Sequence, residues 1–183
     1  MGVTRDPFAF FGEPVEAGEK KLFFLDSSAL SKLYLRENGS EDIQRLVGDR
    51  KIGFHPNVKL CVSRMAFPET LSAIRKQNNL GAITEAETVR LWGEVFQDFL
   101  SSRSPYTIYD TTEAVAGHAA MIVMRHGLRA YDAVHLCTAL RIRAADEEGR
   151  ELVFVSADRR LNNVAREERF TVYDPTEVAP AAN

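Results

Sequence analysis

Five short apolar runs, separated by stretches of helical periodicity, constrain the fold of this 183-residue chain more than any other feature. The runs are nearly continuous in hydrophobicity rather than alternating, which is typical of strands covered on both faces. Strands that alternate with helices predict an α/β sandwich with a mainly parallel sheet. The predicted strands are KLFFL (21–25), KLCV (59–62), YTIY (106–109), LVFVS (152–156) and FTVY (170–173).

Cap signals and apolar faces mark the helices between these runs. Residues 28–37 carry apolar side chains at helical spacing, and another helix is predicted to open at Ser40. Gly127 and Gly149 are predicted to end two later helices, because glycine readily adopts the left-handed conformation of a helix C-terminus. A capping box at Thr84 and Glu87 opens a longer helix, which is predicted to place large apolar side chains on one face: Trp92, Val95, Phe96 and Phe99.

Composition indicates one ordinary globular domain from a reducing compartment. The chain is 45% hydrophobic and 27% charged, which suffices for a sizeable core. Its net charge of −3 offers no overall attraction to nucleic acid, so polyanion binding requires a local basic patch. Cys61 and Cys137 lack metal-ligand spacing and are predicted to be apolar fillers in the cytoplasm. No apolar segment approaches the roughly 18 residues of a membrane span.

The two ends of the chain differ in composition from its centre. Residues 1–20 contain acids and prolines without a long apolar stretch, so they do not resemble a secretory signal. We expect a flexible lead-in over 1–20, one domain over 21–175 and a flexible tail over 176–183.

Four carboxylates fall at comparable positions, each at the end of a predicted strand or the start of a predicted helix. Asp26 follows the first strand, and Asp158 follows the fourth. Glu69 and Asp132 lie at the start of helices. Each one alone has an ordinary explanation as a helix cap or a helix-dipole partner. Because ligands of open α/β sheets bind beyond the carboxyl ends of the strands, we expect the four to share one rim.

Four segments around these acids together resemble the signature segments of PIN-domain nucleases, in particular the VapC-like toxins of toxin–antitoxin pairs. The resemblance extends over about residues 21–175 and implies a PIN-like three-layer α/β/α sandwich with a mainly parallel five-stranded sheet. The long lead-in departs from these compact toxins. The segments are FLDSSALSKLYLRENGSE, SRMAFPETLSAIRK, LRAYDAVHLCTAL and FVSADRRLNNVA.

The resemblance also implies an activity and partners. It implies hydrolysis of RNA by a metal-dependent endoribonuclease, inhibition by a cognate antitoxin protein whose C-terminal segment fills the acidic groove, and a homodimer. The catalytic acids of the family correspond here to Asp26, Glu69, Asp132 and Asp158. The hydroxyl position after the first acid corresponds to Ser27 or Ser28, and Ser156 is a further candidate for holding the last acid or a water.

Electrostatics favours a divalent cation among these acids. Two unit charges about 4 Å apart repel by roughly 4 kcal/mol at an effective dielectric near 20, and oxygen ligands favour Mg²⁺, with Mn²⁺ as the alternative. We predict direct metal contact by Asp26 and Asp132, and water-mediated or second-ion contact by Glu69 and Asp158. His135, one helical turn after Asp132, either borders the pocket or is a satisfied core residue, and we favour the core role.

Cations beside the acidic segments are candidates for contacting RNA phosphates. Arg129 precedes the helix of Asp132, and Arg159 follows Asp158. The remaining candidates are Lys32, Arg36, Arg64 and Arg160.

Other functions remain open or are disfavoured by particular residues. Aspartyl-phosphate phosphatases need a second acid two residues after the first, and Ser28 occupies that position. A receiver domain would need a lysine after a late strand, and none follows LVFVS. A housekeeping PIN ribonuclease and a non-catalytic PIN scaffold that binds RNA or a partner protein both remain open.

Overall fold

The computed structural model describes residues 21–51 and 53–177, and the ends predicted to be flexible lie outside this part, except for 176–177. A five-stranded sheet forms its centre, in the order β5-β4-β1-β6-β7, and every neighbouring pair is parallel. All five predicted strands are confirmed. Their bounds are β1 Lys21–Leu25, β4 Val58–Ser63, β5 Tyr106–Tyr109, β6 Leu152–Val155 and β7 Thr171–Tyr173.

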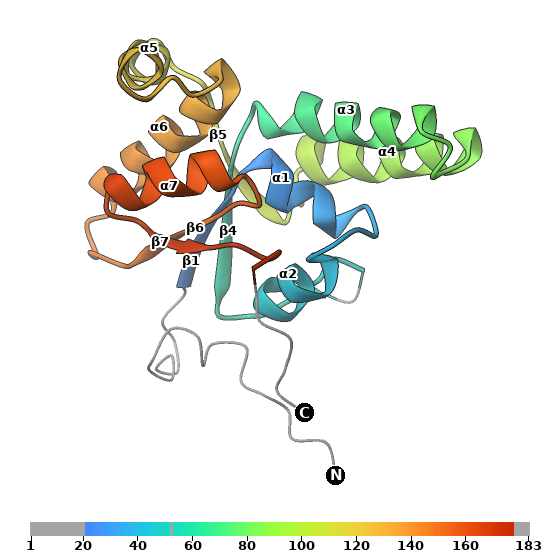
Figure 1. Cartoon of the computed structure of the whole chain (residues 1–183). Coiled ribbons are helices and arrows are strands. Elements are labelled where there is room, and N and C mark those ends of the chain that lie inside the picture. The colour runs from blue at the N-terminus through green and yellow to red at the C-terminus, as the bar shows by residue number, and fades with distance from the viewer. Residues whose placement is uncertain (1–20, 52, 178–183) are drawn as a thin grey trace.

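Helices follow the strands, as the alternating pattern predicts (Figure 1). A two-stranded antiparallel pair, β2 (Gly48–Asp49) with β3 (Gly53–Phe54), was not predicted, because its strands are too short to show periodicity. The helices are α1 Ser27–Leu30, the 3₁₀ turn η2 Ser31–Leu33, α2 Ser40–Val47, α3 Ala66–Asn79, α4 Glu85–Leu100, α5 Glu113–His126, α6 Ala130–Ala145 and α7 Arg159–Glu167.

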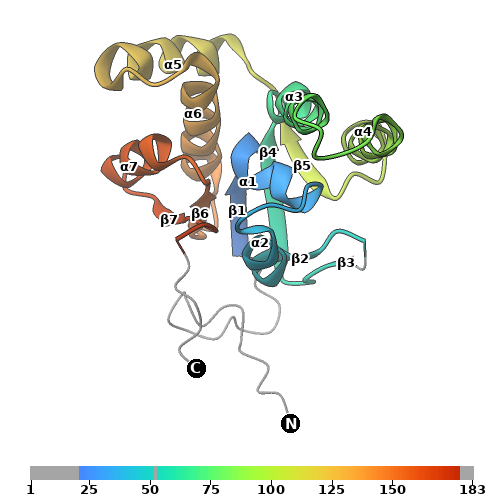
Figure 2. The ribbon, with the colours of Figure 1, turned by 45° about the vertical axis from the view of Figure 1, so that its right-hand side comes forward.

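Alternation along the central strand divides the apolar core into two layers. Phe23 and Leu25 of β1 pack with α1–α4, whereas Leu22 and Phe24 pack with α5–α7. Figure 2 shows these two groups of helices on opposite sides of the sheet. Burial of each such side chain stabilises the fold by about 1.5–3 kcal/mol. The predicted three-layer α/β/α sandwich is therefore confirmed.

Two predicted helices end earlier than expected. The helix predicted over 28–37 is α1 and the short turn η2, where the Ser31 hydroxyl donates to the carbonyl of Ser28 and competes with regular helix geometry. Helix α6 stops at Ala145 instead of Gly149. There the Asp146 carboxylate accepts from the backbone N–H of Arg150 at 2.7 Å and forms an ion pair with its guanidinium, which closes a turn.

The buried face of α4 differs from the predicted one. Thr88, Leu91, Val95 and Phe99 are buried, whereas Phe96 is 46% exposed and Trp92 is only partly covered. Phe96 and Phe99 are neighbours on the helix surface and both contact Phe67 of α3, but Phe96 lies at the edge of the buried face. Thr84 caps α4 as predicted, since its hydroxyl accepts from the N–H of Glu87.

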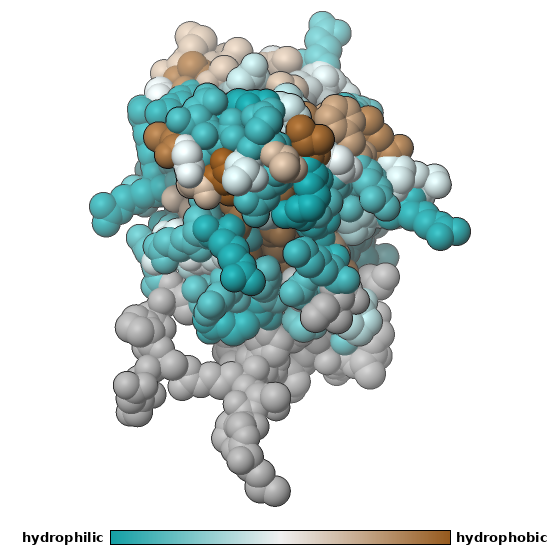
Figure 3. Space-filling model, turned by 90° about the vertical axis from the view of Figure 1, so that its right-hand side faces the viewer, coloured by the Kyte–Doolittle hydropathy of each residue, from teal (hydrophilic) through white to brown (hydrophobic). Residues whose placement is uncertain are grey.

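On the face that Figure 3 shows, apolar residues (brown) form separate small patches among hydrophilic ones rather than one large apolar surface. Within residues 21–51 and 53–177, none of the helices combines the length and the hydropathy needed to cross a bilayer. Cys61 and Cys137 are buried free thiols, in keeping with the predicted filler role, and burial raises the pKa of each to about 11.

Phe99 and Phe96 provide a matched test of the α4 orientation. Phe99 is 3% exposed and stacks on Phe67 with ring centroids 5.1 Å apart, so Phe99→Ala should cost about 3–5 kcal/mol in the free energy of unfolding. Phe96 meets Phe67 edge to face, so Phe96→Ala should cost only about 0.5–1.5 kcal/mol. Urea denaturation measures both, and equal losses would contradict the assigned buried face.

Candidate active site

Asp26 stands where the central strand β1 ends and α1 begins. It is 2% exposed, and its carboxylate caps α1 by accepting from the N–H of Ala29 at 2.8 Å. Its backbone N–H continues the sheet by donating to the carbonyl of Val155 at 3.1 Å. The ordinary capping role and a place at the rim of the sheet therefore apply to the same residue.

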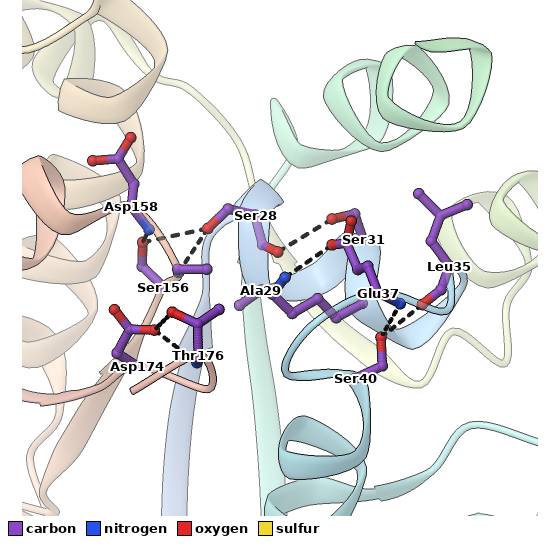
Figure 4. A network of polar contacts seen from close by, with 12 residues as sticks. Ser28, Ala29, Ser31, Leu35, Glu37, Ser40, Ser156, Asp158, Asp174 and Thr176 are labelled. Atoms are coloured by element: carbon purple, nitrogen blue, oxygen red, sulfur yellow. Dashed lines mark hydrogen bonds and ion pairs between the residues drawn. The ribbon is translucent and has the colours of Figure 1, made fainter. Parts of the chain in front are cut away.

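Two serine hydroxyls hold the carboxylate of Asp26 in place. Ser156, just after β6, donates to Oδ2 at 2.8 Å, and Ser28 contacts both oxygens at 2.8 and 2.9 Å. Ser28 Oγ in turn accepts from the N–H of Ala157. Figure 4 shows Ser28 and Ser156 facing each other from the two segments. Three donors for four lone-pair positions leave Asp26 able to accept one more partner.

Asp158 lies beside this network and caps the next helix. The Ser156 hydroxyl accepts from the N–H of Asp158 at 3.0 Å (Figure 4). Asp158 Oδ1 accepts from the N–H of Leu161 at 2.9 Å. The local sequence SAD thus places a hydroxyl and a carboxylate at the carboxyl end of β6, next to Asp26.

Glu69 and Asp132 come from the two opposite helical layers. Glu69 is in the first turn of α3, and Asp132 is in the first turn of α6. Glu69 Oε2 lies 2.5 Å from Nε2 of His135, a residue of α6 with 0% exposure. This contact draws the start of α3 toward α6 above the end of the sheet.

The four carboxylates interact electrostatically. Burial raises the pKa of Asp132, the negative charges of Asp158, Asp26 and Glu69 raise it further, and His135 opposes them. Burial also raises the pKa of Asp26, against the lowering effect of His135, Ala29 and the two serines. Asp132 is therefore coupled electrostatically to each of the other three sequence-predicted acids.

The donor set of this cluster suits a hard divalent cation. In the part of the chain that the structure describes, no three His, Cys, Asp or Glu side chains form a ready-made ligand cage. Mg²⁺ usually takes one or two protein carboxylates and keeps several waters, so it does not require such a cage. Asp26 has a remaining lone pair, and a bound cation would oppose the burial and the neighbouring negative charges that raise the pKa of Asp132.

Comparison with known sequences identifies this arrangement. The sequence model of the PIN domain matches residues 23–167, most of the chain. The chain belongs to the PIN domain family. Two relatives from Mycobacterium tuberculosis, Ribonuclease VapC45 and Ribonuclease VapC49, are each 33% identical to this PIN domain over 147 residues, which is 79% of this chain and 89% of either relative.

Solved structures share the fold at low sequence identity. A toxin–antitoxin complex from Klebsiella pneumoniae contains a chain that is 15% identical, with a TM-score of 0.51. The match covers 85% of this PIN domain and 98% of that chain. It supports the three-layer architecture, whereas the two relatives from Mycobacterium tuberculosis are more similar in sequence.

The cations of this PIN domain differ in availability. Arg129, at the N-cap of α6, and Arg159, the first residue of α7, are exposed beside the acids. Lys32 is instead buried and paired with Glu37 at 2.9 Å, and Arg64 pairs with Asp110. These two were among the predicted phosphate contacts, and sequence order could not show that each already has an acidic partner.

His135 lies in the core, as favoured from the sequence, but its polar atoms are not all satisfied. Among residues 21–51 and 53–177 its buried Nδ1 has no hydrogen-bond partner, whereas Nε2 contacts Glu69. Its spacing from Asp132 places it one turn into α6, but Glu69 is 66 positions away in the sequence. Only packing of α3 beside α6 reveals the contact.

Asp132→Asn should stabilise the metal-free protein near neutral pH. A raised pKa means that the folded state binds this proton more tightly than the unfolded state, so stability is lost as pH rises through the folded pKa. Removing one charge from the cluster should gain of order 1 kcal/mol, or about 2–4 °C in Tm for a chain of this size.

Thermal melting in EDTA measures this effect. The difference between variant and wild type should shrink as pH falls and Asp132 in the wild type becomes protonated. A variant that melts below the wild type at neutral pH would show that the four carboxylates do not repel one another significantly.

Proposed function

We propose that this PIN domain is a Mg²⁺- or Mn²⁺-dependent endoribonuclease that hydrolyses RNA phosphodiesters, and that it is the toxin of a VapBC-type pair. The observation that carries the proposal is the electrostatic coupling of Asp132 to three other carboxylates at one end of the sheet. Relatives named as VapC ribonucleases, similar along most of their length, support it.

The acidic residues would divide the work of holding the cation. Asp26 and Asp132 would bind it directly, because Asp26 is oriented by two serines and Asp132 is set by the first turn of α6. Glu69 and Asp158 would hold its waters or a second ion. When bound, the cation supplies a Lewis acid that offsets the charge on the scissile phosphate and makes water a better nucleophile.

The remaining polar residues would orient the acids and the RNA. Ser28 and Ser156 keep Asp26 from rotating, since each donates to its carboxylate. Arg129, at the N-cap of α6, and Arg159, next to Asp158 in the chain, are exposed, and their guanidinium groups would hold backbone phosphates near the acids. Such contacts would offset the unfavourable approach of RNA to an acidic site.

The proposed setting is a cytoplasmic protein without membrane attachment that forms homodimers and is inhibited by a cognate antitoxin. The solvent-facing side of α4 supports a dimer contact, because Val89, Phe96 and Leu100 are 58%, 46% and 61% exposed along it. Phe99 of the same helix is instead buried in the core. An antitoxin segment with a basic side chain would complement the charge of the acidic cluster.

Mn²⁺ binding and RNA cleavage should depend on the same carboxylates. We expect Mn²⁺ to raise the Tm of the wild type. At a concentration one hundred times its Kd, it should add about 2.7 kcal/mol to the free energy of unfolding. Asp26→Asn and Asp132→Asn should abolish the shift and the cleavage of a labelled RNA oligonucleotide. Glu113→Gln, an exposed acid at the start of α5, is the matched control and should change neither.

A wild type that shows no Mn²⁺ shift would favour the non-catalytic scaffold. If Asp26→Asn still cleaves RNA, the proposed active site is excluded, and the nuclease activity must come from another site of the protein.

Expression in a bacterial host tests the toxin assignment separately. The wild type should arrest growth, Asp26→Ala should not, and co-expression of the product of a short neighbouring gene should restore growth. Colony counts after induction measure the effect. Growth arrest by Asp26→Ala would contradict the nuclease toxin, and cleavage without arrest would favour a housekeeping ribonuclease.

A further inference from the structure

The imidazole of His135 is only half satisfied, although it is entirely buried. Its side chain is 0% exposed, and Nδ1 has no hydrogen-bond partner within the part of the chain that the structure describes. A buried nitrogen without a partner destabilises a fold, and such groups are uncommon in native proteins. An apolar side chain could fill this position of α6 without that penalty. The other ring nitrogen, which contacts Glu69, gives a reason for a histidine here.

The contact between His135 and Glu69 crosses from one helical layer to the other. Helix α6 belongs to the layer of α5–α7, whereas α3 packs in the layer of α1–α4. Glu69 Oε2 and His135 Nε2 are 2.5 Å apart, so the hydrogen bond fixes the distance between the starts of the two helices. The same bond brings a carboxylate from α3 to the acids that α1, α6 and β6 supply.

The ring of His135 is itself held in one orientation. It meets Phe24 of β1 edge to face, with centroids 6.3 Å apart and planes inclined by 61°. Phe24 is in turn stacked on Phe154 of β6. The sheet therefore sets the direction of the imidazole, and the imidazole sets the direction of the Glu69 side chain, which is 22% exposed and would otherwise sample several rotamers.

We propose that His135 is a positioning residue that holds the Glu69 carboxylate at the acidic cluster by donating a hydrogen bond from Nε2. The inference rests on the proposed function and adds to it an explanation of how the Glu69 carboxylate is oriented. His135 acts through Glu69 and touches neither the cation nor the RNA. A partner of this kind, behind a metal-site carboxylate, typically changes metal affinity by about 10–100-fold when it is removed.

Two amide variants separate the hydrogen bond from the volume of the side chain. Glutamine at position 135 carries its amide nitrogen about as far from the backbone as Nε2, whereas the amide of asparagine is one bond shorter. Calorimetric titration with Mn²⁺ alone, without RNA, should show a Kd raised about tenfold for His135→Asn, while His135→Gln stays within about threefold of wild type. His135→Met, which fills a similar volume without a donor, should lose as much as His135→Asn and replaces it if that variant does not fold.

A double variant shows whether His135 works through Glu69. In a Glu69→Gln background, adding His135→Asn should cause no further loss of Mn²⁺ affinity, because the carboxylate that His135 positions is already gone. A purely structural role of His135 would weaken binding to the same extent in both backgrounds. Thermal melting of each variant in EDTA shows that the compared proteins are folded.

The outcomes also separate this inference from the proposed function. If the wild type binds Mn²⁺ and a folded His135→Asn or His135→Met variant binds it equally well, the positioning role is excluded while the metal-dependent nuclease stands. An additive loss in the Glu69→Gln background excludes it in the same way. If the wild type binds no Mn²⁺, the proposed function itself fails, and the inference fails with it.

Discussion

Repulsion among four carboxylates governs the organisation of one end of this protein. The charges of Asp26, Asp158 and Glu69 add to the effect of burial in raising the pKa of Asp132. Bringing like charges together in a partly buried site does not stabilise the fold. The surrounding structure must therefore hold them there, and much of the local architecture does so.

The restraint on Asp26 begins with the sheet. Strand β1 lies between β4 and β6, so its carboxyl end is fixed on both sides, and Asp26 still donates a backbone hydrogen bond to the neighbouring Val155. The side chain then caps α1 and accepts from Ser28 and Ser156. A capping role and a functional role are thus not alternatives here, because the hydrogen bonds that cap the helix also orient the carboxylate. Asp158 repeats the pattern at the start of α7.

Glu69 and Asp132 reach the cluster by a different route. They belong to helices on opposite faces of the sheet, and no backbone ladder joins those helices. Side-chain packing of His135 against Phe24, and its hydrogen bond to Glu69, link the two layers instead. The site thus combines two acids set by strand ends with two set by helix packing, and the second pair depends more on tertiary contacts.

Much of this protein follows from its sequence alone, because the responsible patterns are local. Continuous apolar runs such as KLFFL and LVFV predict buried parallel strands, and the acids that directly follow them must lie at the carboxyl end of the sheet. What only the tertiary structure decided involves partners distant in the chain: the buried face of α4, the ion pair of Arg64 with Asp110, and the approach of His135 to Glu69. Periodicity specifies which side of an element is apolar, but the angle at which two elements pack decides which polar atoms meet, and that angle depends on the shapes of all the side chains between them.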